Sequence, residues 1–221
     1  MVTVHHLEDS RSQRILWLLE ELGVDYQVKR YARDKATRLA PASLKAIHPL
    51  GKSPVIEDAG LIVAETGAIV EFLVDKYGAG KFRPTGDPQD RLRYVYWMHF
   101  AEGSAMPQLL LKLFFMQIKA AKMPFFAKPI AAGIANKVLS SYVDPNIAAQ
   151  FDYIENELNG REWLAGPALS GADIMMSFPM EAAKDRIGLA GRPNCTAYLK
   201  RIQERPAYQR ALEKGGPYAY G

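Results

Sequence analysis

The chain has 221 residues, of which 48% are apolar and 24% are charged, a balance typical of a globular protein with one large or two modest domains. Lysine and arginine exceed aspartate and glutamate by 28 to 24 without forming a basic stripe, so we expect no nucleic-acid partner. The only cysteine, Cys195, excludes an internal disulfide, a CxxC pair and a cysteine-rich zinc site, and we expect no metal cofactor. Because the sequence lacks a secretion signal and any run of 18 apolar residues, we predict a cytoplasmic location and no membrane segment.

The first 77 residues predict a mixture of strands and helices. We expect strands at residues 1–7, 25–32, 54–57 and 61–64. Helices are expected at residues 12–22, with an apolar face through Ile15, Leu19 and Leu22, and at residues 65–77. An irregular helix is expected within the polar loop of residues 33–47. The tripeptide Asp58-Ala59-Gly60 suits a tight turn, so the last two strands are predicted to form a hairpin.

The rest of the chain predicts helices only. We therefore divide the sequence into a first domain at 1–79, a glycine- and proline-rich linker at 80–87, and an all-helical domain at 88–221. One long helix is expected to start near Asp87, run past residue 115 and bend at Gly103 and Pro107. Further helices are expected at residues 130–142, 145–159, 171–188, 194–204 and 206–214.

The segment from Leu169 to Ile174 has the pattern of a helix start. Ser170 and Asp173 are spaced as a capping box, and Leu169 and Ile174 as a hydrophobic staple. We therefore predict a structural role for Asp173 at the start of a helix.

Residues 50–66 predict a small-molecule site. They supply a cation at Lys52, a free backbone edge at Ser53 next to Pro54, and the pair Glu65-Thr66 at a helix N-terminus. These polar features converge only if the two short strands pair as a hairpin. Their arrangement suits a zwitterionic peptide.

Three motifs in order give the sequence a family resemblance that covers the whole chain. They are His48-Pro49-Leu50-Gly51-Lys52-Ser53-Pro54, the pair Glu65-Thr66, and the box from Ser170 to Asp173. With the predicted order of elements, the sequence resembles the soluble glutathione S-transferases. The resemblance implies an α+β fold, with a thioredoxin-like βαβ-ββα domain followed by an all-α bundle. It also implies a homodimer that uses glutathione as co-substrate.

The stretch from His6 to Glu20 is similar to the helix start of serine-type fungal and bacterial transferases. No tyrosine occurs in the first 25 residues and Cys195 lies far along the chain, which disfavours the tyrosine-type and cysteine-type classes. The resemblance implies that Ser10 is the catalytic hydroxyl, which would stabilise a thiolate whose free pKa is about 8.5. Ser12 is the alternative catalytic hydroxyl, and a third interpretation is that one or both serines only cap the helix.

The same resemblance assigns the peptide-binding residues. Pro54 is expected to be cis and to present the backbone of Ser53 to the cysteinyl unit of glutathione. Thr66 and the helix amides would bind the γ-glutamyl carboxylate, with Glu65 at the neighbouring ammonium group. Lys52 would bind the glycine carboxylate.

A second, hydrophobic and electrophilic substrate is expected between the start of the first helix and the bent helix. The residues expected to line this pocket are Arg11, Met106, Leu110, Phe114 and Phe125. Arg14 is predicted to be a buried cation near the contact between the domains. Alternatives are a non-catalytic protein of the same fold that binds glutathione or hydrophobic ligands or serves in assembly, and a glutathione-dependent peroxidase, ether-cleaving enzyme or dehalogenase.

Overall fold

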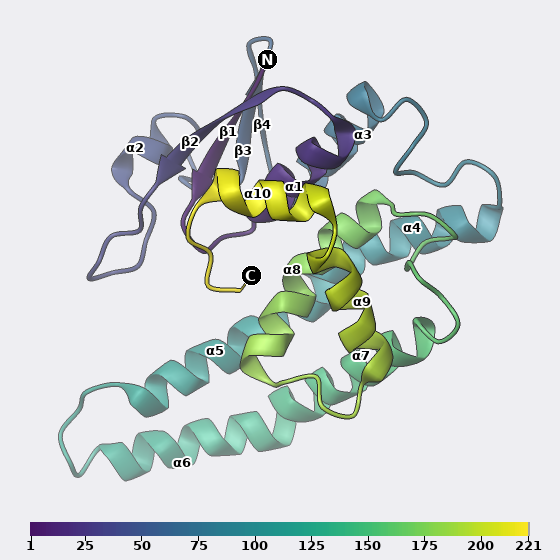
Figure 1. Cartoon of the computed structure of the whole chain (residues 1–221). Helices are drawn as coiled ribbons and strands as arrows, with labels where there is room; N and C mark the ends of the chain where they lie inside the picture. Colours follow the sequence, from purple (N-terminus) through teal and green to yellow (C-terminus); the bar gives the residue numbers. More distant parts are fainter. Residues whose placement is uncertain (221) are drawn as a thin grey trace.

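The computed structural model describes residues 1–220 and contains one four-stranded sheet followed by a helical half (Figure 1). The strands are β1 (Val2–Leu7), β2 (Tyr26–Tyr31), β3 (Val55–Asp58) and β4 (Leu61–Ala64). They lie in the order β2-β1-β3-β4, with β1 parallel to β2 and the other neighbours antiparallel. This topology is the predicted βαβ-ββα unit, and the α+β fold class is confirmed.

Helices α1 and α3 cover one side of the sheet, and the second half of the chain packs beneath them (Figure 1). The helices of the first half are α1 (Gln13–Leu22), α2 (Ala42–Lys45) and α3 (Thr66–Tyr77). Those of the second half are α4 (Pro88–Phe100), α5 (Met106–Ala120), α6 (Lys128–Val138), α7 (Asp144–Glu157), α8 (Gly171–Arg186), α9 (Pro193–Gln203) and α10 (Pro206–Gly215). The change from mixed to helical structure falls between α3 and α4, and the exact domain limits stay a prediction.

Strand β1 divides its side chains between two clusters because successive residues point to opposite faces. Val2 and Val4 join the main core with α1, whereas Leu7 packs with Tyr31 and Leu44 of α2 in a smaller cluster. The β3–β4 hairpin closes through Ala59 and Gly60, whose φ angles of 50° and 84° are the positive values that a type I′ turn requires. The predicted hairpin is therefore confirmed, with both residues of the turn in the left-handed region.

The predicted bend near Gly103 and the predicted gap between residues 142 and 145 are both single π-helical turns. Residues Ala101–Ala105 and Leu139–Val143 form π-helical turns that join α4 to α5 and α6 to α7. Each π turn is followed, two residues later, by a proline, Pro107 or Pro145. Because proline has no N–H to donate, the widened turn accommodates the missing bond without ending the helix. The helices predicted at 130–142 and 145–159 are present as α6 and α7, but a π turn joins them without a break in the chain of helical turns.

Asp173 has the structural role that its motif predicts. The backbone N–H and the hydroxyl of Ser170 both donate to one of its carboxylate oxygens, at 2.9 and 2.8 Å. The other oxygen accepts from the Leu164 N–H at 2.9 Å and the Tyr198 hydroxyl at 3.0 Å. One buried carboxylate thus joins the start of α8 to α9 and to the loop before α8.

Replacing Asp173 with alanine should strongly destabilise the protein. The substitution removes a helix cap and leaves several buried donors without an acceptor, which together cost about 3 kcal/mol. We expect that loss in the free energy of unfolding, measured by chemical denaturation. The exposed Asp25→Ala serves as control and should change it by less than about 0.5 kcal/mol. Equal effects of the two substitutions would contradict the assigned role.

The C-terminal segment after α10 folds back over the junction of the two halves. Its Tyr218 hydroxyl donates to Glu181 of α8 at 2.5 Å, and Tyr208 of α10 donates to the same carboxyl group at 2.6 Å. Burial raises the pKa of Glu181 to about 7, although the two tyrosine donors oppose that shift. Glu181 therefore keeps its proton in the folded protein well above the ordinary value of 4.5.

Stability should fall with rising pH through the titration of Glu181. The unfolded carboxyl ionises near 4.5 and the folded one only near 7, so the stabilisation is complete below 4.5 and is lost as pH rises through 7. Between pH 5 and pH 8 the unfolding free energy of the natural chain should drop by about 2 kcal/mol relative to Glu181→Gln. Denaturant titrations of both proteins at both pH values measure this difference. A parallel pH dependence of the two would contradict it.

Candidate functional site

The topology brings the predicted peptide-binding residues to one edge of the sheet. Val55, at the start of β3, pairs with His5 of β1 on one side and with Ala64 of β4 on the other. The C-terminal ends of β1 and β4 therefore lie beside the first residue of β3. From this edge the chain continues into Ser10 after β1 and into Glu65 after β4, and it arrives through Ser53. The β3–β4 hairpin, on which the convergence of the polar features of residues 50–66 depends, is therefore present.

Ser10 lies in the loop between β1 and α1, at the outer end of a hydrogen-bonded chain of side chains. Its Oγ is 2.7 Å from Ser12 Oγ and accepts from the Ser12 N–H at 3.3 Å. Ser12 Oγ is in turn 2.8 Å from Nδ1 of His6. Both serines are buried, with Ser12 0% exposed and Ser10 5% exposed, so Ser10 is the less completely covered of the two.

His6 is uncharged in this chain of hydrogen bonds. Burial, with a smaller contribution from the charge of Arg30, lowers the pKa of His6 to about 4. At neutral pH its ring therefore carries a single proton, and the ring adds no positive charge behind the serines. Sequence reasoning missed His6, because a histidine in a strand gives no sign of the helix start against which it will pack.

The loop before β3 is held against β1 by the Ser53 side chain. Its hydroxyl donates to the His5 carbonyl at 2.8 Å and accepts from the Leu7 N–H at 3.2 Å. The Ser53–Pro54 peptide bond is cis, as predicted. Within residues 1–220, no hydrogen bond between backbone groups uses the N–H or carbonyl of Ser53, which leaves this edge open to an extended ligand. Lys52 is exposed beside it.

The start of α3 supplies the second part of the edge. Thr66 is the first residue of the helix and is buried, whereas Glu65 precedes it and is exposed. Glu65 has φ 70° and ψ 122°, an uncommon backbone conformation for a residue other than glycine. Such conformations persist where the surrounding structure requires them and often mark ligand sites.

Arg14 and Glu102 link the two halves of the chain directly behind the Ser10 loop. Arg14, on α1, is buried; it pairs with Glu102 of the first π turn and donates to the Met175 carbonyl of α8. Arg11 donates to both oxygens of Glu102, at 2.9 and 3.0 Å. Burial alone would raise the pKa of Glu102, but the charges of Arg14 and Arg11 outweigh it and hold that pKa below its ordinary value. The buried cation predicted at Arg14 is confirmed.

The residues expected around the electrophile do not all lie together. Leu110 and Phe114 are exposed one turn apart on α5, and their role beside an electrophile stays a prediction. Met106 is only 2% exposed because it packs in the core, so it offers no surface to a ligand. Phe125 is 88% exposed in the turn between α5 and α6, at the far end of that helical pair (Figure 1). For Met106 and Phe125 the structure contradicts the predicted role.

The C-terminal segment supplies neighbours of the Ser10 loop that the sequence analysis missed. The Ala219 N–H donates to Asp9 at 3.0 Å, one residue before Ser10. Tyr220 packs edge-on against Phe178 with ring centres 5.6 Å apart, and the Arg11 guanidinium lies 5.5 Å from the Phe178 ring centre. No periodic pattern identifies such a contact, because it is made by an irregular segment more than 200 residues from the loop it meets.

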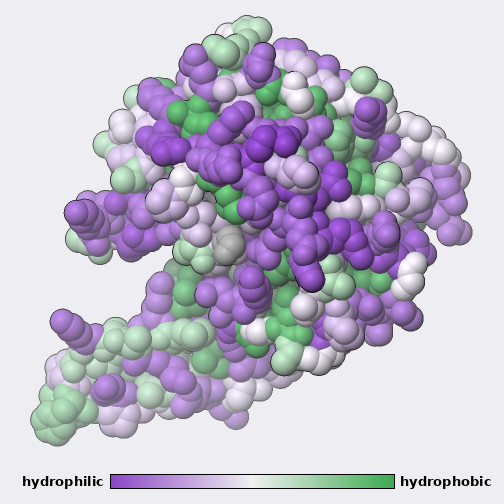
Figure 2. Space-filling model, in the orientation of Figure 1, coloured by the Kyte–Doolittle hydropathy of each residue, from purple (hydrophilic) through white to green (hydrophobic). Residues whose placement is uncertain are grey.

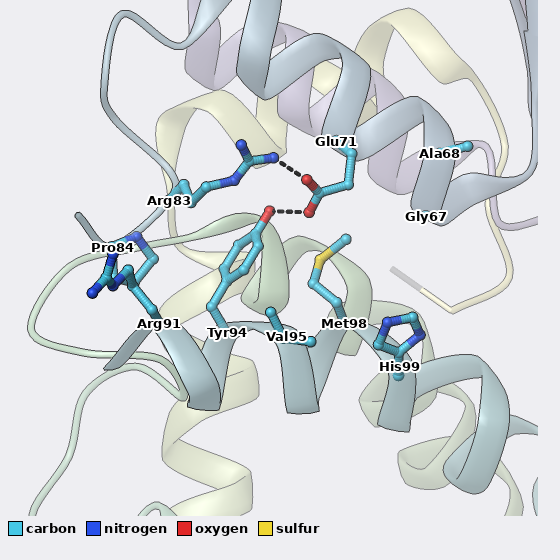
Figure 3. A pocket seen from close by; sticks show the side chains of 10 residues that line it. All are labelled: Gly67, Ala68, Glu71, Arg83, Pro84, Arg91, Tyr94, Val95, Met98 and His99. Atoms are coloured by element: carbon cyan, nitrogen blue, oxygen red, sulfur yellow. Dashed lines mark hydrogen bonds and ion pairs between the residues drawn. The ribbon is translucent and has the colours of Figure 1, made fainter. Parts of the chain in front are cut away.

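A separate cavity of about 590 Å³ opens between α3 and α4 (Figure 3). Glu71 of α3 accepts there from Arg83 and from the Tyr94 hydroxyl, the latter at 2.6 Å. The cavity starts at Gly67, directly after Thr66, but none of the predicted site residues lines it. The apolar side chains of Val95 and Met98 form much of its wall on α4.

The described part of the chain offers neither an available cysteine nucleophile nor a metal-binding cluster. Cys195 is buried, and burial strongly raises the pKa of its thiol, so it is not an available nucleophile. Among residues 1–220, no group of three or more His, Cys, Asp or Glu side chains is arranged to hold a metal ion.

Comparisons with known proteins identify the family. Residues 1–75 match the family model of the Glutathione S-transferase, N-terminal domain, and residues 115–206 that of the Glutathione S-transferase, C-terminal domain. Glutathione S-transferase 3 of Schizosaccharomyces pombe is 37% identical over 97% of this chain and 88% of its own length. Glutathione S-transferase 1 of Saccharomyces cerevisiae is 34% identical over 97% of this chain and 95% of its own.

A solved structure agrees with these relatives. The crystal structure of a glutathione S-transferase from Actinobacillus pleuropneumoniae is 36% identical, with a TM-score of 0.81 over 100% of this chain and 95% of that one. The chain therefore belongs to the glutathione S-transferase family.

Proposed function

We propose that this protein binds glutathione at the edge formed by Ser10, Ser53 and Thr66 and transfers its thiolate to a small hydrophobic electrophile. The observation that carries the proposal is the Ser10 hydroxyl, held at the ligand-facing end of the chain that runs back to Ser12 and His6. Family membership supports glutathione as the co-substrate. The thiolate sulfur forms a bond to the electrophilic carbon, and the leaving group, a halide in the case of an aryl halide, departs with the bonding electrons, so the reaction needs no redox partner.

The hydrogen bonds around Ser10 favour donation to sulfur. Its oxygen already accepts from the Ser12 N–H, and a neutral His6 with its proton on Nδ1 would direct the Ser12 hydroxyl proton toward Ser10 as well. The Ser10 proton is then free to point into the site. A hydroxyl donated to an anion contributes about 1.5–3 kcal/mol, enough to lower a thiol pKa by about one to two units.

The remaining polar groups suit the rest of the tripeptide. The unpaired backbone of Ser53 would pair with the cysteinyl unit as an added strand. Thr66 and the first amides of α3 would bind the γ-glutamyl carboxylate, and Glu65 the ammonium group beside it. Lys52, exposed at the other end of the cis-proline loop, would take the glycine carboxylate.

For the electrophile, we propose the space between the Ser10 loop and α5. Leu110 and Phe114 would supply its apolar wall, and the Phe178–Tyr220 pair the side next to Arg11. Arg11 would face the mouth of the site while remaining paired with Glu102. This composition favours an aromatic or alkyl electrophile over a charged one.

Ser10→Ala should raise the pH midpoint of the transferase reaction. Loss of the donor should move the pKa of the bound thiol up by about one to two units, and should cut the rate at pH 6.5 about tenfold or more. The measurement is kcat/KM against pH with a generic aryl halide, together with calorimetry for glutathione binding. Ser140→Ala, an exposed serine on the second π turn, is the matched control. If Ser10→Ala keeps both the natural rate and midpoint, Ser10 does not activate the thiol.

We also propose that two copies associate through α4 and the neighbouring cavity. Leu92 and Val95 are exposed on α4 although both are apolar, and Val95 lines the cavity beside α3. A partner laid on this face would cover them and close the region next to Thr66. Such an assembly is the homodimer expected from the sequence.

Leu92→Glu combined with Val95→Glu should split this dimer. Two acidic side chains on each copy would be buried without partners, so the mass measured by light scattering should fall from twice to once 24.6 kDa. Leu39→Glu, at an exposed leucine in the loop before α2, should leave the mass unchanged. A natural chain that stays at the single mass at all concentrations would contradict the proposal.

A further inference from the structure

Helices α5 and α6 form a hairpin that projects from the body of the protein (Figure 1). We call residues 106–138 the α5–α6 hairpin. Its outer half contacts little besides itself: of its apolar side chains, only Met106, Leu109 and Ala135 are buried, and two of these lie in the first turn of α5. In the space-filling view the hairpin is an arm with an apolar tip, separated from the upper body by a notch (Figure 2).

The outer half of the hairpin exposes large apolar side chains. Phe125 and Phe126 at the tip are 88% and 65% exposed and contact each other edge-on. The exposed apolar residues that continue from the tip along both helices are Phe114, Met116, Ile118, Ile130 and Ile134. A patch of this kind on a projecting element indicates a contact surface, because isolated exposed apolar residues would not gather at one end of the molecule.

The charge of the hairpin has one sign only. From residue 103 to 143 the sequence contains no aspartate or glutamate, and its charged residues are the lysines Lys112, Lys119, Lys122, Lys128 and Lys137. Lys112 pairs with Asp144 at the base, at 2.7 Å, whereas the other four are exposed. The rest of the chain mixes both signs, so the hairpin is a cationic arm with an apolar tip.

This combination favours an anionic lipid surface over a second copy of the chain. Two hairpins placed against each other would bring lysines together without any acid to neutralise them. Aromatic residues inserted at a headgroup boundary, with lysines reaching the phosphates, are the known features of interfacial anchors.

We propose that the α5–α6 hairpin docks this protein on anionic membranes, with Phe125 and Phe126 entering the headgroup layer and Lys119, Lys122 and Lys128 contacting lipid phosphates. Within residues 1–220 no helix is long and apolar enough to cross a bilayer, and surface docking does not require one. The proposal goes beyond the transferase reaction and does not depend on it.

Vesicle co-sedimentation of the full chain tests the proposal. We expect binding to vesicles of phosphatidylcholine with 30% phosphatidylserine, weaker binding to phosphatidylcholine alone, and loss of binding as salt is raised. Lys122→Gln with Lys128→Gln should weaken binding about 25-fold, at about fivefold for each lysine. Phe125→Ser with Phe126→Ser should weaken it about tenfold or more. Thermal unfolding verifies that each variant is folded.

Matched controls separate the hairpin from general charge and hydrophobicity. Lys35→Gln with Lys81→Gln removes two exposed lysines elsewhere, and Leu39→Ser removes an exposed leucine. Both should bind vesicles within about threefold of the natural chain, because these positions lie outside the surface. If the hairpin variants bind as well as these controls, the proposal is wrong. It is equally wrong if the natural chain binds none of these vesicles. A change of mass in light scattering caused by the phenylalanine variants would then make the hairpin a protein contact.

Discussion

The ion pair between the buried Arg14 and the partly exposed Glu102 holds the site together, because it fixes α1, which follows the serine loop, against the helical half. Arg14 also donates to the Met175 carbonyl, so one guanidinium contacts the first π turn and α8 at once. A buried cation without its partners would cost several kcal/mol, which makes the relative position of the two halves strongly preferred. Arg11 donates hydrogen bonds to the same Glu102 carboxylate and thereby holds the loop that contains Ser10 in place.

The proposed chemistry depends on the hydrogen bonds and the burial of the two serines in that loop. Ser12 is fully buried and bonded to a neutral His6, while Ser10, at the other end of the hydrogen-bonded chain, is slightly less buried. A helix start usually uses such hydroxyls as caps, yet Ser12 makes no side-chain cap to α1. The two serines thus form a short polar chain inside an apolar setting, where each bond is stronger than in water. In the proposed reaction, the Ser10 hydroxyl at the end of this chain is the hydrogen-bond donor that stabilises the thiolate.

Exposed apolar side chains gather at the two proposed contact surfaces, the α4 face and the α5–α6 hairpin, and the charges around them differ. The face at α4 carries leucine and valine with mixed charges around it, which suits a second copy of the chain. The α5–α6 hairpin carries phenylalanine and isoleucine with lysines only, which suits an anionic layer. The hairpin carries none of the peptide-binding residues, so docking would leave that edge open, whereas the α4 face borders the edge beside Thr66.

The sequence alone determined the order of strands and helices, the hairpin turn and the Asp173 cap. These are local patterns, fixed by side-chain period, turn chemistry and short-range hydrogen bonding. Its motifs also carried the family resemblance, which implied the cis proline. Only the tertiary structure decided that Met106 is core, that Phe125 is exposed at a tip, and that two prolines give π turns within continuous helices. It also placed His6 behind Ser12 and Ala219 on Asp9. These depend on packing between segments distant in sequence, which no local pattern encodes.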